Sequence, residues 1–554
     1  MLSSYQQWLE SINVEAPKAH IEAQDDGQRG LFASHDIFAG ERILHLPSRA
    51  LLSEERLRTQ GASILETREG NVELSKEQLV VGMIEELHQL MHGTDDTSMV
   101  QMTARSIQYQ WRGDDTVALY LIACRKLVKQ QSESAVVEES SSAEESMIEQ
   151  VVDAPAAEAE PILVHNVVPV AVQDSLEDEP LQQPATNDEE DTVAVEQDEV
   201  SFCSFLPHVV MLPDSFPTNP LYFTDEELSG VEGTNCYEFT KRMLVQMESD
   251  WMQLSAVLRA YLVMDDRRIP SAQDDYWNPD EDFEHYKWAL NAIYSRSTDF
   301  FINQDHRRVI APLFDMMNHE FASNVTHAMD QNGNLSVFAG SDIPAGSEIF
   351  LRYGDFPNEK MLSVYGFVVP FNPYDAVQIY APIPSADPLF AIKAQILKSK
   401  CGVLDPNAPH ALRLNEPIPE SLLCTLRLVG LQSEEDLELA ASSSESFAGV
   451  VSRENEYNAL MALSQALHTM ARRLALNMIS DENLQAANSN NDVINSGDPP
   501  VVDQHESSKT ISNLNIAHCK ILCQSEYLIL QSALEELSTR LELLENPELD
   551  ITSQ

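Results

Sequence analysis

The sequence predicts an α+β protein in which a domain of small β-sheets with a helical insertion precedes a mainly helical domain. Three observations support this prediction. Strand patterns with glycine turns occur near residues 27–47 and again at 343–354. Between them, apolar residues recur at helical spacing in 50–130 and 224–295. Beyond residue 378, helical patterns dominate. A chain of 554 residues also exceeds what one hydrophobic core accommodates.

The first part of the chain combines a short helix with two strands. Residues 1–12 place five apolar side chains at helical spacing. The stretch Gly27-Gln-Arg-Gly30-Leu-Phe-Ala33 and the segment 42–47 read as strands on either side of the Gly40-Glu41 turn. Glycines at 27 and 30 allow close backbone approach to a ligand, although such turns are also common without one.

Several helices follow from apolar periodicity and from terminal signals. Thr224-Asp-Glu-Glu227 is a capping box that predicts the start of a helix. The remaining helices of this half are expected at residues 79–91, 115–129, 237–264 and 280–295.

Residues 131–200 differ in composition from the rest of the chain. They are rich in Asp and Glu and contain no Lys, Arg, Trp, Tyr or Phe. Such a segment cannot bury enough apolar surface to offset its ordering entropy, so we expect a disordered acidic insertion. It is either a tether for a basic partner or simply a tolerated surface insertion.

The carboxy-terminal part is expected to form a separate helical domain from about 379 to 554, after a first domain at 1–378 with a helical insert at about 50–295. This second domain contains four helix-rich stretches and one polar stretch. The helices are predicted at 385–400, 417–443, 451–479 and 510–546, with a disordered linker at about 481–509.

Charge and composition limit the classes of partner. Asp and Glu outnumber Lys and Arg by 89 to 35, a net charge of −54. This balance argues against nucleic-acid binding and favours a protein substrate that is basic near its target residue.

No apolar run reaches the ~20 residues of a membrane span, and MLSSYQQWLE lacks a targeting signal. We therefore expect a monomer in the cytoplasm, the nucleus or both, with no membrane contact.

The cysteines indicate a reducing compartment without a metal site. Their number, seven, is odd, and no CxxC pair occurs. His518, Cys519 and Cys523 lie close together on a predicted helix, but a zinc site there would need a fourth ligand from elsewhere. We expect no metal.

The most informative stretch runs from Asp315 to Phe367. It contains in order Asp315-Met-Met-Asn318-His319, the turn Ile343-Pro-Ala-Gly346, a predicted strand at 348–351 followed by Tyr353-Gly354, and Asn358 before Tyr365-Gly366-Phe367. Each piece alone has an ordinary structural explanation. A lone histidine is usually a satisfied core residue, and a tyrosine at a strand end usually packs with its hydroxyl in water.

Taken together with Gly27–Ala33 and the Tyr286–Arg296 helix, these motifs resemble the SET methyltransferase domain. The resemblance is closest to the branch named for the Rubisco large-subunit lysine methyltransferase. It reaches from about residue 5 to 378, apart from the acidic insertion and residues 93–114. No cysteine-rich cluster follows Phe367, which argues against the histone-type branch and for the one with a helical substrate-binding domain.

The resemblance implies a fold, a cofactor and site residues. The fold threads its carboxy-terminal segment through a loop as a pseudoknot, a rare exception to unthreaded chain connections. The cofactor is S-adenosylmethionine, Tyr353 is the catalytic tyrosine, and Tyr365 lines the channel for the target side chain. The implied cofactor-binding residues are Gln28, Arg29, Gly30, Arg296, Asn318, His319, Tyr353 and Phe367.

The function expected from the sequence is that of a protein-lysine N-methyltransferase acting on a non-histone protein. A protein-histidine methyltransferase is the alternative enzyme, because the same branch includes one. A catalytically silent SET scaffold that binds a partner is the alternative without activity.

Overall fold

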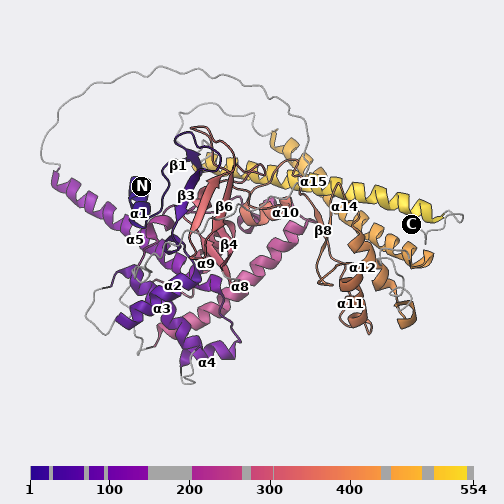
Figure 1. Ribbon diagram of the computed structural model, residues 1–554, viewed down its shortest axis with the longest axis horizontal. Helices are drawn as coiled ribbons and strands as arrows, with labels where there is room; N and C mark the ends of the chain where they lie inside the picture. The colour runs from indigo at the N-terminus through magenta and orange to yellow at the C-terminus, as the bar shows by residue number, and fades with distance from the viewer. Residues whose placement is uncertain are drawn as a thin grey trace, which may run out of the picture.

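A computed structural model describes residues 2–23, 29–67, 74–92, 98–146, 202–264, 276–302, 305–437, 451–489 and 504–545. Small sheets lie beside a block of helices, and a second group of helices lies at the other end of the molecule (Figure 1). The predicted α+β architecture, with a helical carboxy-terminal part, is confirmed.

Within the described residues, the β structure consists of four small antiparallel sheets. The two-stranded sheets are β1 (Ala19–Ala23) with β2 (Arg29–Ala33), β4 (Ser297–Ile302) with β5 (Asp305–Ile310), and β8 (Val377–Ile379) with β9 (His410–Leu412). The three-stranded sheet has the order β3 (Arg42–Leu46), β7 (Leu335–Ala339) and β6 (Val325–Met329). Strand β7 therefore pairs with an element almost 300 residues earlier in the chain.

Helices surround the three sheets that contain β1–β7, and all of these helices except α7 share one apolar core with them. The first group is α1 (Leu2–Ser11), η1 (Ser48–Ala50), α2 (Glu54–Thr67), α3 (Lys76–His92), α4 (Met99–Ser106) and α5 (Gly113–Ser146). The second is α6 (Leu206–Val209), η3 (Pro220–Tyr222), α7 (Asp225–Ser229), α8 (Asn235–Leu262) and α9 (Phe283–Arg296). Thr224 caps α7 in the predicted capping box, where its side chain accepts from the Glu227 N–H.

The carboxy-terminal helices form a second core. They are α11 (Phe390–Lys400), α12 (Glu420–Gly430), α14 (Arg453–Ser489) and α15 (Gln504–Glu545). Leucines of α14 and α15 pack together with β8 and β9. Within the described residues, no helix has the length and apolar character needed to cross a bilayer.

Two expected disordered segments are partly helical in the structure. Helix α5 continues through residues 131–146, and α14 and α15 cover 481–489 and 504–509 of the expected linker. These stretches extend helices that begin in well-packed parts of the chain, and propagating a helix costs much less than nucleating one. The rest of each segment, 147–201 and 490–503, lies outside the described residues.

Helix α15 also packs against the first domain. Leu522 and Cys519 share an apolar cluster with Leu362 and Val368. The Cys519 thiol donates to the Glu227 carbonyl over 3.6 Å, so this side chain contributes to the contact between α15 and α7. In the described parts of the chain, no three His, Cys, Asp or Glu side chains gather as metal ligands would.

One acid at this interface is buried without compensation. Glu526 of α15 is 1% exposed, and neither carboxyl oxygen has a hydrogen-bond partner among the described residues. Burial, with Asp375 and Glu359 nearby, raises its pKa well above the ordinary value. The folded state thus favours the protonated acid. Stability falls as pH rises past about 4.3, where the unfolded chain ionises.

Replacing this acid with its neutral isostere is expected to stabilise the protein. At pH 8, Glu526→Gln should raise the free energy of unfolding by about 1–3 kcal/mol, because the folded state no longer takes up a proton or holds a buried charge. The gain should vanish at pH 4. Glu542→Gln, at an exposed position of α15, is the matched control. Denaturant unfolding of both variants at the two pH values measures the effect, and equal stability of Glu526→Gln and parent at pH 8 contradicts it.

Candidate active site

The centre of the site is an extended segment that is paired on both sides. The Ile349 N–H donates to the Leu31 carbonyl of β2 over 2.7 Å. On the opposite side, the Leu351 N–H donates to the Asn318 carbonyl over 2.9 Å, and the Glu320 N–H donates back to the Leu351 carbonyl over 3.2 Å. This second pairing is parallel. It brings together two segments far apart in the chain, as the predicted pseudoknot requires.

The predicted strand at 348–351 forms only isolated bridges, so that prediction is corrected. The reason is a side chain that takes the place of a neighbouring strand. Asn324 donates through Nδ2 to the Glu348 carbonyl over 2.9 Å and accepts from the Phe350 N–H over 2.8 Å. The segment is thus held in an extended form without a continuous ladder on that side.

Four aromatic rings meet beside this segment. The Tyr353 ring centroid lies 5.2 Å from that of His319 and 4.8 Å from that of Tyr365. The Phe367 ring lies 6.0 Å from His319 and 6.2 Å from Tyr365. Sequence-predicted catalytic, channel and cofactor-binding residues are therefore gathered in one aromatic cluster.

His319 is a neutral imidazole with one free donor. Its Nδ1 accepts from the Tyr353 N–H over 3.1 Å, which assigns the proton to Nε2. Burial is the largest cause that lowers its pKa, so the ring is uncharged at neutral pH. The Nε2 atom is buried and has no hydrogen-bond partner among the described residues. A buried N–H of this kind is suited to a ligand acceptor.

Tyr353 keeps its hydroxyl proton. The hydroxyl donates to the Met317 carbonyl over 2.9 Å. Burial raises the pKa of this phenol well above its ordinary value, with Arg296 opposing the shift. The residue can therefore orient a nitrogen by hydrogen bonding but cannot act as a base at neutral pH.

The turn that carries Tyr365 and Phe367 is fixed from inside the protein. Asn358 at the start of α10 (Asn358–Lys360) is fully buried and donates to the Val369 carbonyl and to Asp375, both over 3.0 Å. Its Oδ1 accepts from the Val369 N–H over 2.8 Å. One amide thus closes the whole turn, which explains why asparagine stands at this position of the motif.

Between these ends the chain forms a π-helical turn, η5 (Met361–Tyr365), with Gly366 left-handed at φ +80°. Such a turn leaves carbonyls without their usual helical donors. The Asn219 amide fills this role, because its Nδ2 donates to the Ser363 carbonyl over 3.1 Å and to the Val364 carbonyl over 3.3 Å. The geometry of the Tyr365 side chain thus depends on a residue from the helical insert.

The amino-terminal motif reaches the same site through its backbone. The Asn318 amide donates to the Arg29 carbonyl over 3.4 Å and to Glu348 Oε1 over 2.6 Å. The Arg29 guanidinium instead donates to the Met211 carbonyl over 3.0 Å. A Cβ on Gly30 would lie 2.4 Å from the Glu348 carboxylate, so any other residue there would displace that carboxylate. Gln28 lies outside the described residues.

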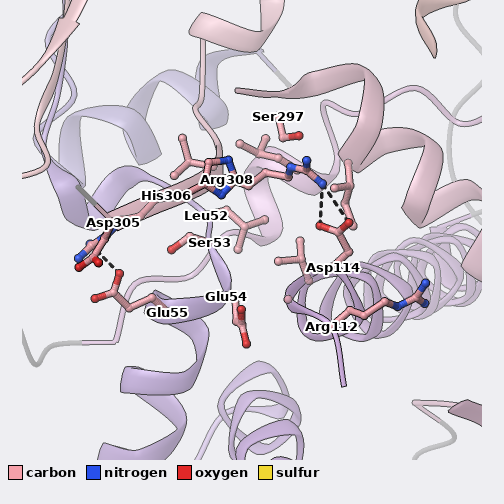
Figure 2. Close-up of a pocket in the computed structure, with 16 residues that line it drawn as sticks. Leu52, Ser53, Glu54, Glu55, Arg112, Asp114, Ser297, Asp305, His306 and Arg308 are labelled. Carbon is pink, nitrogen blue, oxygen red and sulfur yellow. Dashed lines mark hydrogen bonds and ion pairs between the residues drawn. The ribbon is translucent and has the colours of Figure 1, made fainter. Parts of the chain in front are cut away.

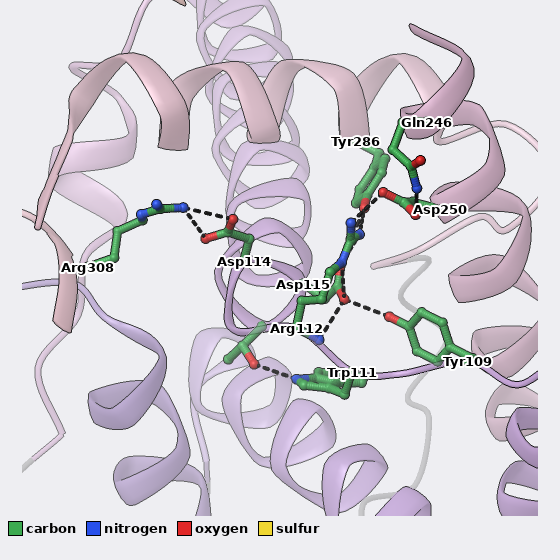
Figure 3. Close-up of polar contacts among 10 residues, drawn as sticks. Tyr109, Trp111, Arg112, Asp114, Asp115, Gln246, Asp250, Tyr286 and Arg308 are labelled. Atoms are coloured by element: carbon green, nitrogen blue, oxygen red, sulfur yellow. Dashed lines mark hydrogen bonds and ion pairs between the residues drawn. The ribbon is translucent and has the colours of Figure 1, made fainter. Parts of the chain in front are cut away.

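Arg296 lies at the end of α9, and the packing of that helix determines its position. Figure 3 shows Arg112 between α5, α8 and α9, where it pairs with Asp115 and Asp250 and donates to the Tyr286 hydroxyl over 2.7 Å. At the other end of α9, Arg296 Nη1 donates to the Asp315 carbonyl over 3.0 Å. The helix therefore links a partly buried ion-pair cluster to the motif that contains Asn318 and His319.

A cavity of about 510 Å³ opens beside Tyr353. Its walls come from α8, α9, the β4–β5 hairpin and η5, and include Tyr365 and Arg296. Gly30, Asn318, His319 and Phe367 are not part of this lining. Of the residues expected to bind the cofactor, Arg296 and Tyr353 therefore line the cavity, whereas His319 and Phe367 lie on the other side of the Tyr353 ring.

A neighbouring cavity of about 610 Å³ shares Ser297 and Arg308 with the first (Figure 2). Its charges are paired: Arg308 contacts Asp114 over 3.0 Å, and Arg307 contacts Glu55 over 2.6 Å. The paired charges support the β4–β5 hairpin that forms one wall of the Tyr353 cavity.

Comparison with known proteins defines the family. The SET domain matches residues 28–354, which is more than half of the chain, and the Rubisco LSMT substrate-binding domain matches residues 384–493. The chain therefore belongs to the SET-domain family, in the branch that carries the Rubisco LSMT substrate-binding domain. The resemblance inferred from the sequence is therefore confirmed at the level of the family.

The curated relatives share only about a quarter of the aligned residues with this chain. The chain is 26% identical over 234 residues to actin-histidine N-methyltransferase of Xenopus tropicalis, which covers 42% of this chain and 38% of that protein. The Homo sapiens protein of the same name is 25% identical over 232 residues, or 41% and 37%. The matched region therefore spans less than two fifths of these relatives.

Solved structures share the fold at low identity. The SET domain of LSMT bound to lysine and AdoHcy superposes with a TM-score of 0.59 at 15% identity, covering 98% of this chain and 92% of that one. Rubisco LSMT bound to AdoMet gives 0.55 at 16% identity, covering 99% and 96%. These likenesses establish the fold alone.

The residues present fit S-adenosylmethionine on structural grounds. The Nε2–H of His319, which has no partner among the described residues, lies on a ring beside that of Phe367, and Gly30 leaves its backbone next to the Glu348 carboxylate. Adenine needs hydrogen bonds at its edge and an apolar face. Asp315 belongs to the Asp315–His319 motif and Glu348 to the predicted strand, but neither was assigned a role from the sequence because acidic residues at such positions are common.

A methyl group at position 30 is expected to weaken cofactor binding. Gly30→Ala forces the Glu348 carboxylate away from Asn318, so affinity for S-adenosylmethionine should fall about tenfold, or about 1.4 kcal/mol. Gly113→Ala is a matched control, because its Cβ would also lie 2.5 Å from a glutamate oxygen, that of Glu54. Calorimetric titration should show a loss of affinity only at position 30. Equal affinities in the two variants contradict the expectation.

Proposed function

We propose that the protein transfers a methyl group from S-adenosylmethionine to a side-chain nitrogen of a non-histone protein. The observation that carries the proposal is the pairing that brings Asn318 and His319 to Tyr353 at the edge of the cavity. A silent scaffold has no need of a buried, unpartnered imidazole donor beside a protonated tyrosine. The acidic net charge of the chain supports a substrate that is basic around its target.

The chain's own residues orient the reaction. When bound, S-adenosylmethionine supplies a methyl group on a positively charged sulfur. The oxygen atoms of the Tyr353 hydroxyl and the Met317 carbonyl, which lie 2.9 Å apart, would face the polarised methyl hydrogens and could accept weak C–H···O contacts from them. Tyr365 forms part of the cavity wall and limits how the target side chain enters. Catalysis then rests mainly on alignment and on exclusion of water.

Removing the Tyr353 hydroxyl is expected to stop turnover but not cofactor binding. Tyr353→Phe should lower kcat about 100-fold or more, because the group that orients the target nitrogen is lost. Affinity for S-adenosylmethionine should stay within about threefold of the parent. Tyr294→Phe removes a hydroxyl from the same cavity wall and is the control. Radiolabel transfer and calorimetry provide both measurements, and a Tyr353→Phe variant with near-parental kcat excludes the assigned role.

For the target residue, we favour histidine on the basis of cavity charge. The lining contains Arg296, Arg308, Arg352 and Lys360 but only two carboxylates. No carboxylate lies within ion-pair distance of Lys360 in the described part of the chain, whereas Arg308 and Arg352 are paired. Deprotonating a lysine costs about 4 kcal/mol near pH 7.4, while histidine is already mostly neutral. The actin-histidine N-methyltransferase relatives support the same choice.

Lysine, the target expected from the sequence, is the second candidate. One observation favours it: the Lys360 ammonium lies 3.5 Å from the centroid of Phe356, whose ring stacks on Tyr365 at 6.3 Å. These aromatic faces can therefore hold an ammonium group. The solved LSMT structure bound to lysine is in keeping with this alternative.

Neutralising Lys360 is expected to shift the preference toward lysine. With matched peptides that differ only at the target residue, Lys360→Gln should raise the lysine-to-histidine ratio of kcat/KM about tenfold, because a cation next to the incoming ammonium is removed. Lys398→Gln, on the surface of α11, is the control. Mass spectrometry of the peptides identifies the methylated residue. A parent enzyme that prefers lysine, with the ratio unchanged in Lys360→Gln, rejects the histidine assignment.

A further inference from the structure

A row of side chains connects the amino-terminal helix with the active site. The Tyr5 hydroxyl of α1 lies 2.9 Å from Nδ1 of His208 on α6. The other ring nitrogen of His208, Nε2, lies 3.2 Å from Asp315 Oδ2. Arg296 Nη1 lies 3.6 Å from the same oxygen. Four residues from four separate segments of the sequence thus form a continuous series of contacts.

This row is shielded from water. Tyr5 is 3% exposed and His208 1%, and the Asp315 side chain is fully buried. Neither carboxyl oxygen of Asp315 has a well-formed hydrogen bond from the described residues. A buried carboxylate is costly unless cations or donors face it, and His208 and Arg296 are the groups that do so here.

The His208 ring is held in one orientation. It stacks on the ring of Tyr5 at 6.1 Å between centroids and on that of Trp8 at 6.3 Å. Trp8 is itself fixed, because its indole N–H donates to the Ser204 carbonyl over 2.8 Å. With Tyr5 donating to Nδ1, the ring proton lies on Nε2, which faces Asp315 Oδ2 at 3.2 Å without forming a well-aligned hydrogen bond. Packing therefore determines which side of the ring faces the carboxylate.

Asp315 in turn restrains Arg296 from two directions. Its backbone carbonyl accepts from Nη1 over 3.0 Å, and its carboxylate faces the same nitrogen. The Arg296 Nε atom is buried without a hydrogen-bond partner among the described residues. The guanidinium is thus fixed at one end and retains an unused donor beside the Tyr353 cavity, whose wall it helps to form.

We propose that Tyr5 and His208 are positioning residues for Arg296, acting through Asp315. They set the direction of the guanidinium that would hold the carboxylate of S-adenosylmethionine. The inference rests on the proposed function and adds to it a dependence of cofactor affinity on α1 and α6, two elements outside the recognised motifs. Neither Tyr5 nor His208 belongs to the lining of the Tyr353 cavity.

The test uses two substitutions at position 208 that preserve different halves of the ring. His208→Gln places an amide N–H near the position of Nε2 and keeps the contact with Asp315. His208→Asn reaches only the position of Nδ1 and loses it. We expect the dissociation constant for S-adenosylmethionine to rise at least tenfold in His208→Asn and less than threefold in His208→Gln, with kcat at saturating cofactor little changed in both.

Two further variants keep the test decisive. Tyr5→Phe removes one hydroxyl and should raise the same dissociation constant about threefold, even if His208→Asn fails to fold. His410→Gln, at another buried histidine, is the control for a loss of packing and should leave cofactor affinity unchanged. Full-length protein is titrated with S-adenosylmethionine, and melting temperatures are recorded in parallel.

The outcomes separate this inference from the proposed function. If the parent binds cofactor and Arg296→Gln weakens binding, but every variant at positions 5 and 208 binds like the parent, the positioning role is overturned and the methyltransferase assignment stands. Equal losses in His208→Gln and His208→Asn that follow melting temperature also overturn it. A parent that binds no S-adenosylmethionine overturns the proposed function and this inference together.

Discussion

The two-sided pairing of residues 349–351 is the constraint on which the active site depends. An extended segment between β2 and the Asn318–Glu320 stretch has its backbone groups satisfied from both sides. Neither neighbour could shift without leaving buried N–H or carbonyl groups unpaired, which costs about 1–3 kcal/mol each. The same hydrogen bonds that stabilise the fold therefore set the distances between His319, Tyr353 and the amino-terminal motif.

Much of the fold could be predicted from the sequence because its signals are local. The capping box at Thr224, the apolar periodicity of α8 and the order of the motifs all depend on neighbours within a few residues. The extent of α5 to Ser146 could not be predicted, because composition alone does not reveal how far a stabilised helix propagates into an acidic segment. The predicted strand at 348–351 failed because an asparagine side chain, from Asn324, replaced a backbone partner.

Some residues of the candidate site could be predicted from the sequence and others could not, for a related reason. Tyr353, His319 and Phe367 belong to motifs and could be named, although their assigned roles remain predictions. Glu348, Asn219 and His208 could not, because each acts through a contact with a residue at least 30 positions away. Ordinary residue types give no sign of such partners, and only the folded arrangement shows that a buried amide or imidazole supports the site.

The π-helical turn at Met361–Tyr365 has a consequence for how target preference could change in this family. It accommodates one more residue per turn than a regular α-helix, and Asn219 compensates for the carbonyls this exposes. A single-residue deletion there would restore regular winding and remove the bulge next to Tyr365, which would reposition its side chain. The aperture through which a side chain enters could then be remodelled by a change in chain length alone, without replacing any residue that touches the methyl donor.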